Sequence, residues 1–103
     1  LYEQDIHQAV TRRLTEAGLP FTHEKNLAPG CRIDFWCGGV GIEIKKGKPK
    51  PSALLEQLRR YAVSEEIGTL VVLTQRSVRL PTAVCGKPLV QITLNQLWGV
   101  ALP

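Results

Sequence analysis

The sequence lacks the long apolar stretches of a membrane protein. No run of apolar residues approaches the roughly 18–20 that a membrane-spanning helix needs, and no signal-peptide pattern opens the chain. Internal repeats and low-complexity tracts are also missing. We therefore expect a globular, cytoplasmic protein without a membrane partner. Because the chain begins at Leu1 rather than Met, we expect either a trimmed protein or a fragment of a longer chain.

Cysteine is scarce and unevenly spaced. The three cysteines, Cys31, Cys37 and Cys85, form no C-x-x-C pair, and their odd number argues against a disulfide framework. His7 and His23 do not complete the ligand spacing of a structural zinc site with them. Reduced thiols in a cytosolic protein fit this pattern best.

Length and charge indicate one domain with an anionic partner. A chain of 103 residues with 44% hydrophobic composition can bury a single core, so residues 1–103 form one domain. The net charge is +4, which by itself is an ordinary value. The stretch from Lys45 to Arg60, however, holds six basic residues and one acid, Glu56. The basic residues are Lys45, Lys46, Lys48, Lys50, Arg59 and Arg60.

Hydrophobic periodicity and turn residues predict an α/β domain of order α-β-β-β-α-β. The Gly- and Pro-rich residues 47–51 separate the third strand from the second helix, for which Ser52 is the expected cap. Residues 75–88 receive no assignment. The predicted helices span residues 3–17, 52–64 and 94–100, and the predicted strands span residues 21–27, 32–37, 40–45, 69–74 and 89–92. Strand 69–74 is apolar throughout its centre, which predicts burial on both faces.

The Gly38-Gly39 pair predicts a two-residue hairpin loop that places Asp34 opposite Glu43. Directly opposed side chains share a face, with Cβ atoms about 4.5–5.5 Å apart, and Lys45 emerges on the same face. Two facing carboxylates repel unless a cation compensates them. Mg²⁺ or Mn²⁺, held by both carboxylates and a backbone carbonyl, would do so better than Lys45 alone. A solvated strand face with an ordinary Lys45 ion pair fits the geometry equally well.

The opposite face of the same hairpin is the expected core side. By strict alternation, this face carries Ile33 and Phe35 from one strand with Ile42 and Ile44 from the other.

These residues resemble a known nuclease signature. Asp34, eight intervening residues and then Glu43-Ile44-Lys45 resemble the D…E-x-K motif of the PD-(D/E)XK nuclease superfamily, with Ile33 in place of the family's proline. The sequence from Gln57 to Tyr61 resembles the Q-h-x-x-Y motif of its RecB-like and lambda-exonuclease-like branches. The order of elements also resembles the family's, and the resemblance covers roughly residues 2–74.

The resemblance implies a restriction-endonuclease-like three-layer core, in which helices flank a central mixed sheet. It also implies a metal-dependent nuclease that hydrolyses DNA phosphodiester bonds with Mg²⁺ or Mn²⁺, RNA remaining open as a substrate. Asp34, Glu43 and Lys45 would be catalytic, with Lys45 positioning the attacking water and offsetting charge. The metal would be held by Asp34, Glu43, the Ile44 carbonyl and Glu3. The nucleic acid would be contacted by Gln57, Tyr61, Lys46, Lys48 and Lys50.

Each of these residues also has a structural interpretation. Glu3, in the first turn of a helix, would stabilise the helix dipole, and Gln57 and Tyr61 would be packing residues. Glu24 resembles a recurrent family position or forms a surface ion pair with Lys25 or Arg32, while His7 is better explained as structural.

Two other functions compete with the nuclease. The first is a non-catalytic DNA-binding module on the same fold, and the second is a small protein-interaction domain in which D…E-x-K is a coincidence. In the latter case Asp34→Asn should leave stability unchanged or improved, and no divalent ion should raise the melting temperature. Substrate structure and the choice between endonuclease and exonuclease stay open. A homodimer or a larger parent protein would supply specificity that a chain this short lacks.

Overall fold

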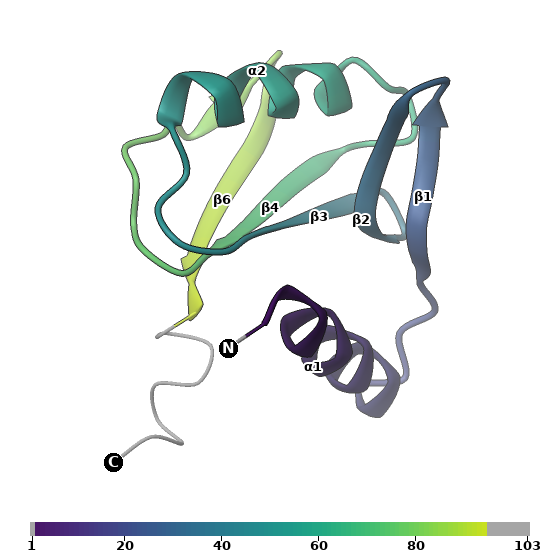
Figure 1. Cartoon of the computed structure of the whole chain (residues 1–103). Coiled ribbons are helices and arrows are strands. Elements are labelled where there is room, and N and C mark those ends of the chain that lie inside the picture. Colours follow the sequence, from purple (N-terminus) through teal and green to yellow (C-terminus); the bar gives the residue numbers. More distant parts are fainter. Residues whose placement is uncertain (1, 95–103) are drawn as a thin grey trace.

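A computed structural model describes residues 2–94, which form a mixed sheet with one helix against each face (Figure 1). The elements of this part of the chain are α1 (Glu3–Glu16), β1 (Thr22–Ala28), β2 (Cys31–Cys37), β3 (Val40–Lys45), α2 (Pro51–Ala62), β4 (Thr69–Thr74), β5 (Ala83–Val84) and β6 (Lys87–Thr93). Neither helix is long and apolar enough to cross a membrane. The helix predicted for residues 94–100 lies, beyond Leu94, outside the described residues.

The α/β class and the predicted order of elements up to β4 are confirmed. The six described strands lie in the order β1-β2-β3-β4-β6-β5. Strands β3, β4 and β6 run parallel, whereas β1, β2 and β5 pair antiparallel with their neighbours. The unassigned residues 75–88 contain the short strand β5 and the beginning of β6.

The predicted cap of the second helix is wrong. Helix α2 begins at Pro51, so Ser52 lies inside its first turn, and Lys50 is the cap residue without a side-chain capping bond. Proline favours the first helical position because its φ is already helical and its missing N–H would have no partner there. The residue before a proline prefers extended backbone, as Lys50 does with ψ 120°.

Two cores lie on opposite sides of the sheet. On the α2 side, Leu54, Leu58 and Tyr61 pack against buried residues of β2, β4 and β6. On the α1 side, Ile6 and Val10 pack against the other face. Strand β4 contributes to both cores, which confirms its predicted burial from two sides (Figure 1).

The prediction that Ile33 and Phe35 share one face is wrong. Ile33 belongs to the core under α2, whereas Phe35 belongs to the core under α1. The paired residues of β1 and β2 include His23 with Phe35 and Lys25 with Ile33, but Glu24 between them has a φ of 57° and no strand partner in this register. Asp34 also has no partner in this register, and the alternation of β2 is broken between Ile33 and Phe35.

Candidate active site

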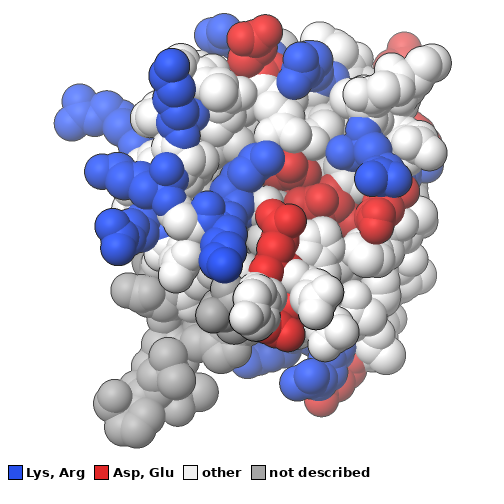
Figure 2. Space-filling model, viewed as in Figure 1, with Lys and Arg blue, Asp and Glu red and all other residues white. Residues whose placement is uncertain are grey.

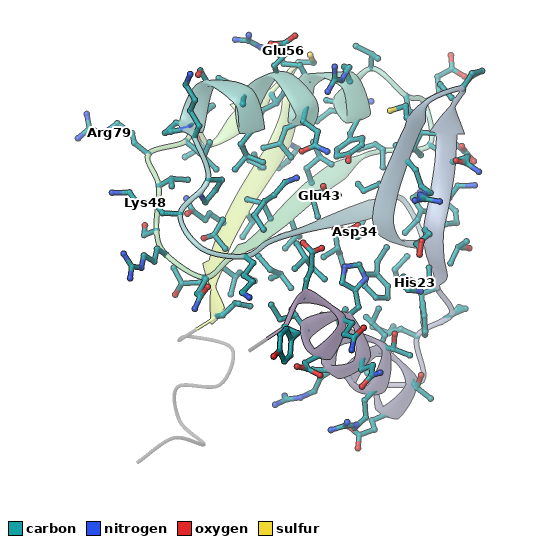
Figure 3. The ribbon with its side chains drawn as sticks, viewed as in Figure 1. His23, Asp34, Glu43, Lys48, Glu56 and Arg79 are labelled. Carbon is teal, nitrogen blue, oxygen red and sulfur yellow. The ribbon has the colours of Figure 1, made fainter. Side chains whose placement is uncertain are left out.

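The candidate site is formed where β2 and β3 separate in the middle of the sheet (Figure 3). The hairpin has the predicted register, in which Phe35 pairs with Ile42, and both glycines of its turn have positive φ, as a twist-matched two-residue loop requires. At the next position, side chains bridge the strands. Asp34 Oδ2 accepts a bond from the Ile44 N–H at 2.8 Å, and the Asp34 N–H donates to Glu43 Oε1 at 3.3 Å.

Glu43 is a buried carboxylate with incomplete charge compensation. Only 4% of the residue is exposed. Burial, and then the charge of Asp34, raise the pKa of Glu43 from 4.5 to about 7, whereas the Lys45 ammonium acts in the opposite direction. Lys45 Nζ lies 3.2 Å from Glu43 Oε2. The predicted Asp34–Glu43–Lys45 constellation is therefore brought together, and the lysine offsets only part of the cost of burying the acid.

Helix α2 places Gln57 and Tyr61 on the same side of the sheet as Glu43. The Gln57 amide donates to the Tyr61 hydroxyl at 2.8 Å, and this hydroxyl donates to the Arg32 carbonyl at 3.1 Å. Tyr61 also lies within hydrogen-bonding reach of Glu43, and burial together with the Glu43 charge raises the pKa of the phenol. Tyr61 is thus a core residue, with only 2% of it exposed, and a neighbour of the acid. Its structural interpretation is confirmed, and its contact with nucleic acid stays a prediction.

A pair of histidines extends the site toward α1. His7 Nε2 lies 3.9 Å from Asp34 Oδ1, and His7 Nδ1 lies 2.8 Å from His23 Nε2. The His23 ring stacks on Phe35, with ring centroids 4.5 Å apart. His7 therefore has a polar environment at Asp34, in addition to the structural role expected for it. The signal in the sequence was its position beside Ile6 on the buried stripe of the helix.

Glu3 and Glu24 lie on the rim of an open cavity of about 560 Å³ beside the two histidines. Both residues are exposed, and among residues 2–94 neither forms a hydrogen bond or ion pair with Asp34 or Glu43. Glu24 pairs instead with Arg32 at 3.8 Å, which is one of the two alternatives stated for it. The structure therefore places Glu3 at the cavity that His7 also lines, whereas Asp34 and Glu43 do not line this cavity.

Asp34 and Glu43 suit an oxygen-preferring divalent ion. Their carboxylates are hard ligands of the kind that Mg²⁺ and Mn²⁺ take, and burial, followed by the charge of Asp34, raises the pKa of Glu43. Within residues 2–94, no group of three or more acidic, histidine or cysteine side chains is arranged to hold a metal ion. The remaining ligands would be the Ile44 carbonyl and solvent.

The predicted nucleic-acid contacts Lys46, Lys48 and Lys50 are exposed in the loop after β3. Lys46 lies over the Tyr2 ring, 5.5 Å from its centroid. Figure 2 shows acidic side chains gathered in the middle of one face, with Lys and Arg on the side where Figure 3 labels Lys48 and Arg79. The loop therefore provides exposed positive charge beside the acidic centre.

Comparisons of the chain with protein-family models, with curated proteins and with solved structures find no match.

Proposed function

We propose that this protein is a metal-dependent nuclease that hydrolyses DNA phosphodiester bonds on a restriction-endonuclease-like core. The single observation that carries the proposal is the Asp34–Glu43 pair, joined across β2 and β3 by side-chain bonds to the backbone, with Lys45 3.2 Å from the buried acid. A fold gains no stability from an acid whose pKa burial raises to about 7. A bound cation and a phosphate substrate explain why such a pair is present.

In this proposal, each residue of the site has a separate role. Asp34, Glu43 and the Ile44 carbonyl would hold Mg²⁺ or Mn²⁺, which when bound supplies Lewis-acid polarisation of the phosphate. Lys45 holds a positive charge beside Glu43, where it offsets negative charge that develops on the phosphate and orients the attacking water. Tyr61, fixed by Gln57 and by the Arg32 carbonyl, supports Glu43 from the α2 side.

The proposal is tested by cleavage of plasmid, linear and single-stranded DNA and of single-stranded RNA, each with Mg²⁺, Mn²⁺ or EDTA. We expect metal-dependent cutting by the wild-type protein and its loss in Asp34→Asn and in Lys45→Ala. Glu56→Gln is the matched control, because it removes one carboxylate from an exposed position on α2 (Figure 3). Nicked circles would indicate an endonuclease, and shortened linear DNA an exonuclease.

Absence of cutting on every substrate with either metal would refute the catalytic proposal. In that case, retained binding of DNA would identify the non-catalytic module. A melting temperature that no divalent ion raises, together with an unaffected Asp34→Asn variant, would favour a protein-interaction domain.

A further inference from the structure

Two loops leave the sheet side by side next to the candidate site. Strands β3 and β4 are parallel, and their last residues, Lys45 and Thr74, are paired in the register. The loop of residues 46–50 follows β3, and the loop of residues 75–82 follows β4. Both loops therefore begin at the same edge of the sheet, which is the edge that also carries Lys45.

The two loops are joined by hydrogen bonds. The Gly47 N–H donates to Gln75 Oε1 at 2.8 Å, and the Arg76 N–H donates to the Gly47 carbonyl at 3.1 Å. In addition, the Gln75 N–H donates to the Lys45 carbonyl at 3.1 Å. These bonds fix the beginning of the second loop against the first, so the two loops form one continuous surface.

Hydrogen bonds from the Gln91 side chain of β6 also hold the second loop in place. The Gln91 side chain accepts a bond from the Val78 N–H at 2.9 Å and donates to the Val78 carbonyl at 2.7 Å. Thr74 adds a bond to the same Gln91 oxygen at 3.1 Å. The loop backbone between Arg76 and Arg79 is thereby held in place before any ligand binds, which lowers the entropic cost of binding.

The charge on this surface has a single sign. We call the surface formed by the two loops the two-loop surface. Its cations are Lys46, Lys48, Lys50, Arg76 and Arg79. All five are exposed, and within residues 2–94 none lies in an ion pair. Residues 44–55 and 67–103 contain no Asp or Glu. At the β1 side of the sheet, by contrast, Lys25 pairs with Glu66, and Arg32 pairs with Glu24.

We infer that the two-loop surface binds the phosphate backbone of a nucleic acid strand and directs it to Asp34 and Glu43 from the edge formed by the ends of β3 and β4. Arg76 and Arg79 are the new members of this site, since only the lysines were expected from the sequence. The inference deepens the proposed function, on which the identity of the ligand rests. Cations without ion-pair partners, held on loops of fixed conformation, suit the repeated phosphates of a nucleic acid. Contacts to phosphates need positive charge and do not depend on the base sequence.

The test measures binding of a short fluorescent DNA strand, single-stranded and as a duplex, over a series of salt concentrations in EDTA. The variant is Arg76→Gln/Arg79→Gln. Its matched control, Arg59→Gln/Arg60→Gln, removes the same charge from exposed positions in the last turn of α2, at the opposite end of that helix from Lys50. Fluorescence anisotropy gives Kd at each salt concentration, and Mg²⁺-dependent cutting is measured in parallel.

We expect the loop variant to bind about 10-fold more weakly at low salt, with the slope of log K against log salt reduced by about 1.4–1.8 for two lost phosphate contacts. The control variant should keep most of the wild-type slope. Equal losses in both variants, or no binding by the wild-type protein at low salt, would overturn the inference. Binding that depends on the loops without any cutting would leave the inference standing and refute only the nuclease.

Discussion

Replacing Glu43 with Gln should make the protein more stable at alkaline pH in the absence of metal. In the folded protein, burial and Asp34 raise the pKa of Glu43 from 4.5 to about 7. Between pH 4.5 and pH 7 the folded state therefore holds a proton that the unfolded state has released. The free energy of unfolding falls as pH rises through this window and stays lower above it, because the buried side chain is then charged in both states.

The size of the effect follows from the pKa. A rise from 4.5 to about 7 corresponds to a stability cost of about 3 kcal/mol once Glu43 is fully ionised. Glutamine carries no such cost, and its amide oxygen can still accept either the Asp34 N–H or the Lys45 ammonium. It cannot accept both bonds, and the loss of one bond reduces the gain in stability by about 1 kcal/mol. We therefore expect the free energy of unfolding of Glu43→Gln to exceed that of the wild type by about 2 kcal/mol above pH 7. Below pH 4.5 the two proteins should differ little.

Urea denaturation in EDTA on either side of the window measures this difference, with Glu56→Gln as the control. Glu56 is exposed, so its replacement should leave the pH dependence of stability unchanged. Mg²⁺ should then stabilise only those proteins that keep Glu43, by about 2.7 kcal/mol at a hundredfold excess over Kd. If the difference between wild type and Glu43→Gln is the same at both ends of the window, the argument from burial is refuted.

Two further predictions concern packing around the site. Gly41→Ala should destabilise the protein by about 1–3 kcal/mol in urea denaturation, because a Cβ there would lie 2.6 Å from Ile33 Cδ1. Gly68→Ala, whose Cβ would have only an ordinary contact, is the control, and equal losses in both would contradict the argument. Gln91→Met should lower the free energy of unfolding by about 2 kcal/mol, because the N–H and the carbonyl of Val78 both lose their hydrogen-bond partner. It should also weaken DNA binding, although the charge of the protein is unchanged. Unchanged anisotropy titrations would show that the loop needs no support.

The hairpin was predictable because its signals are local. Two glycines fix a two-residue turn, the turn fixes the register, and the register places Glu43 beside Asp34. The parallel position of β4 follows from the intervening helix α2, since parallel strands need a crossover connection. The acid–acid–lysine constellation follows from this register, whereas the broken alternation of β2 between Ile33 and Phe35 does not.

Other features depend on contacts between distant segments, which a single sequence does not reveal. The meeting of His7 with His23 and Asp34 requires the angle at which α1 crosses the sheet. Ile33 and Phe35 face opposite cores beside Glu24 of β1, which has a positive φ that is uncommon for this residue type. Residues 75–80 carry no periodicity, and their fixed shape comes from the Gln91 side chain on a later strand.

The distribution of charge connects stability with the proposed activity. The sheet buries Glu43 beside Asp34 at a cost of about 3 kcal/mol above pH 7, which is a large part of the stability of a domain this size. The same chain keeps five exposed cations on the two-loop surface without acidic partners among residues 2–94. In the proposed complex, a divalent cation would relieve the cost of burying Glu43, and a phosphate backbone would pair with the exposed cations. A phosphodiester with its metal ion would supply both at once, so the buried carboxylates and the two-loop surface favour the same proposed ligand.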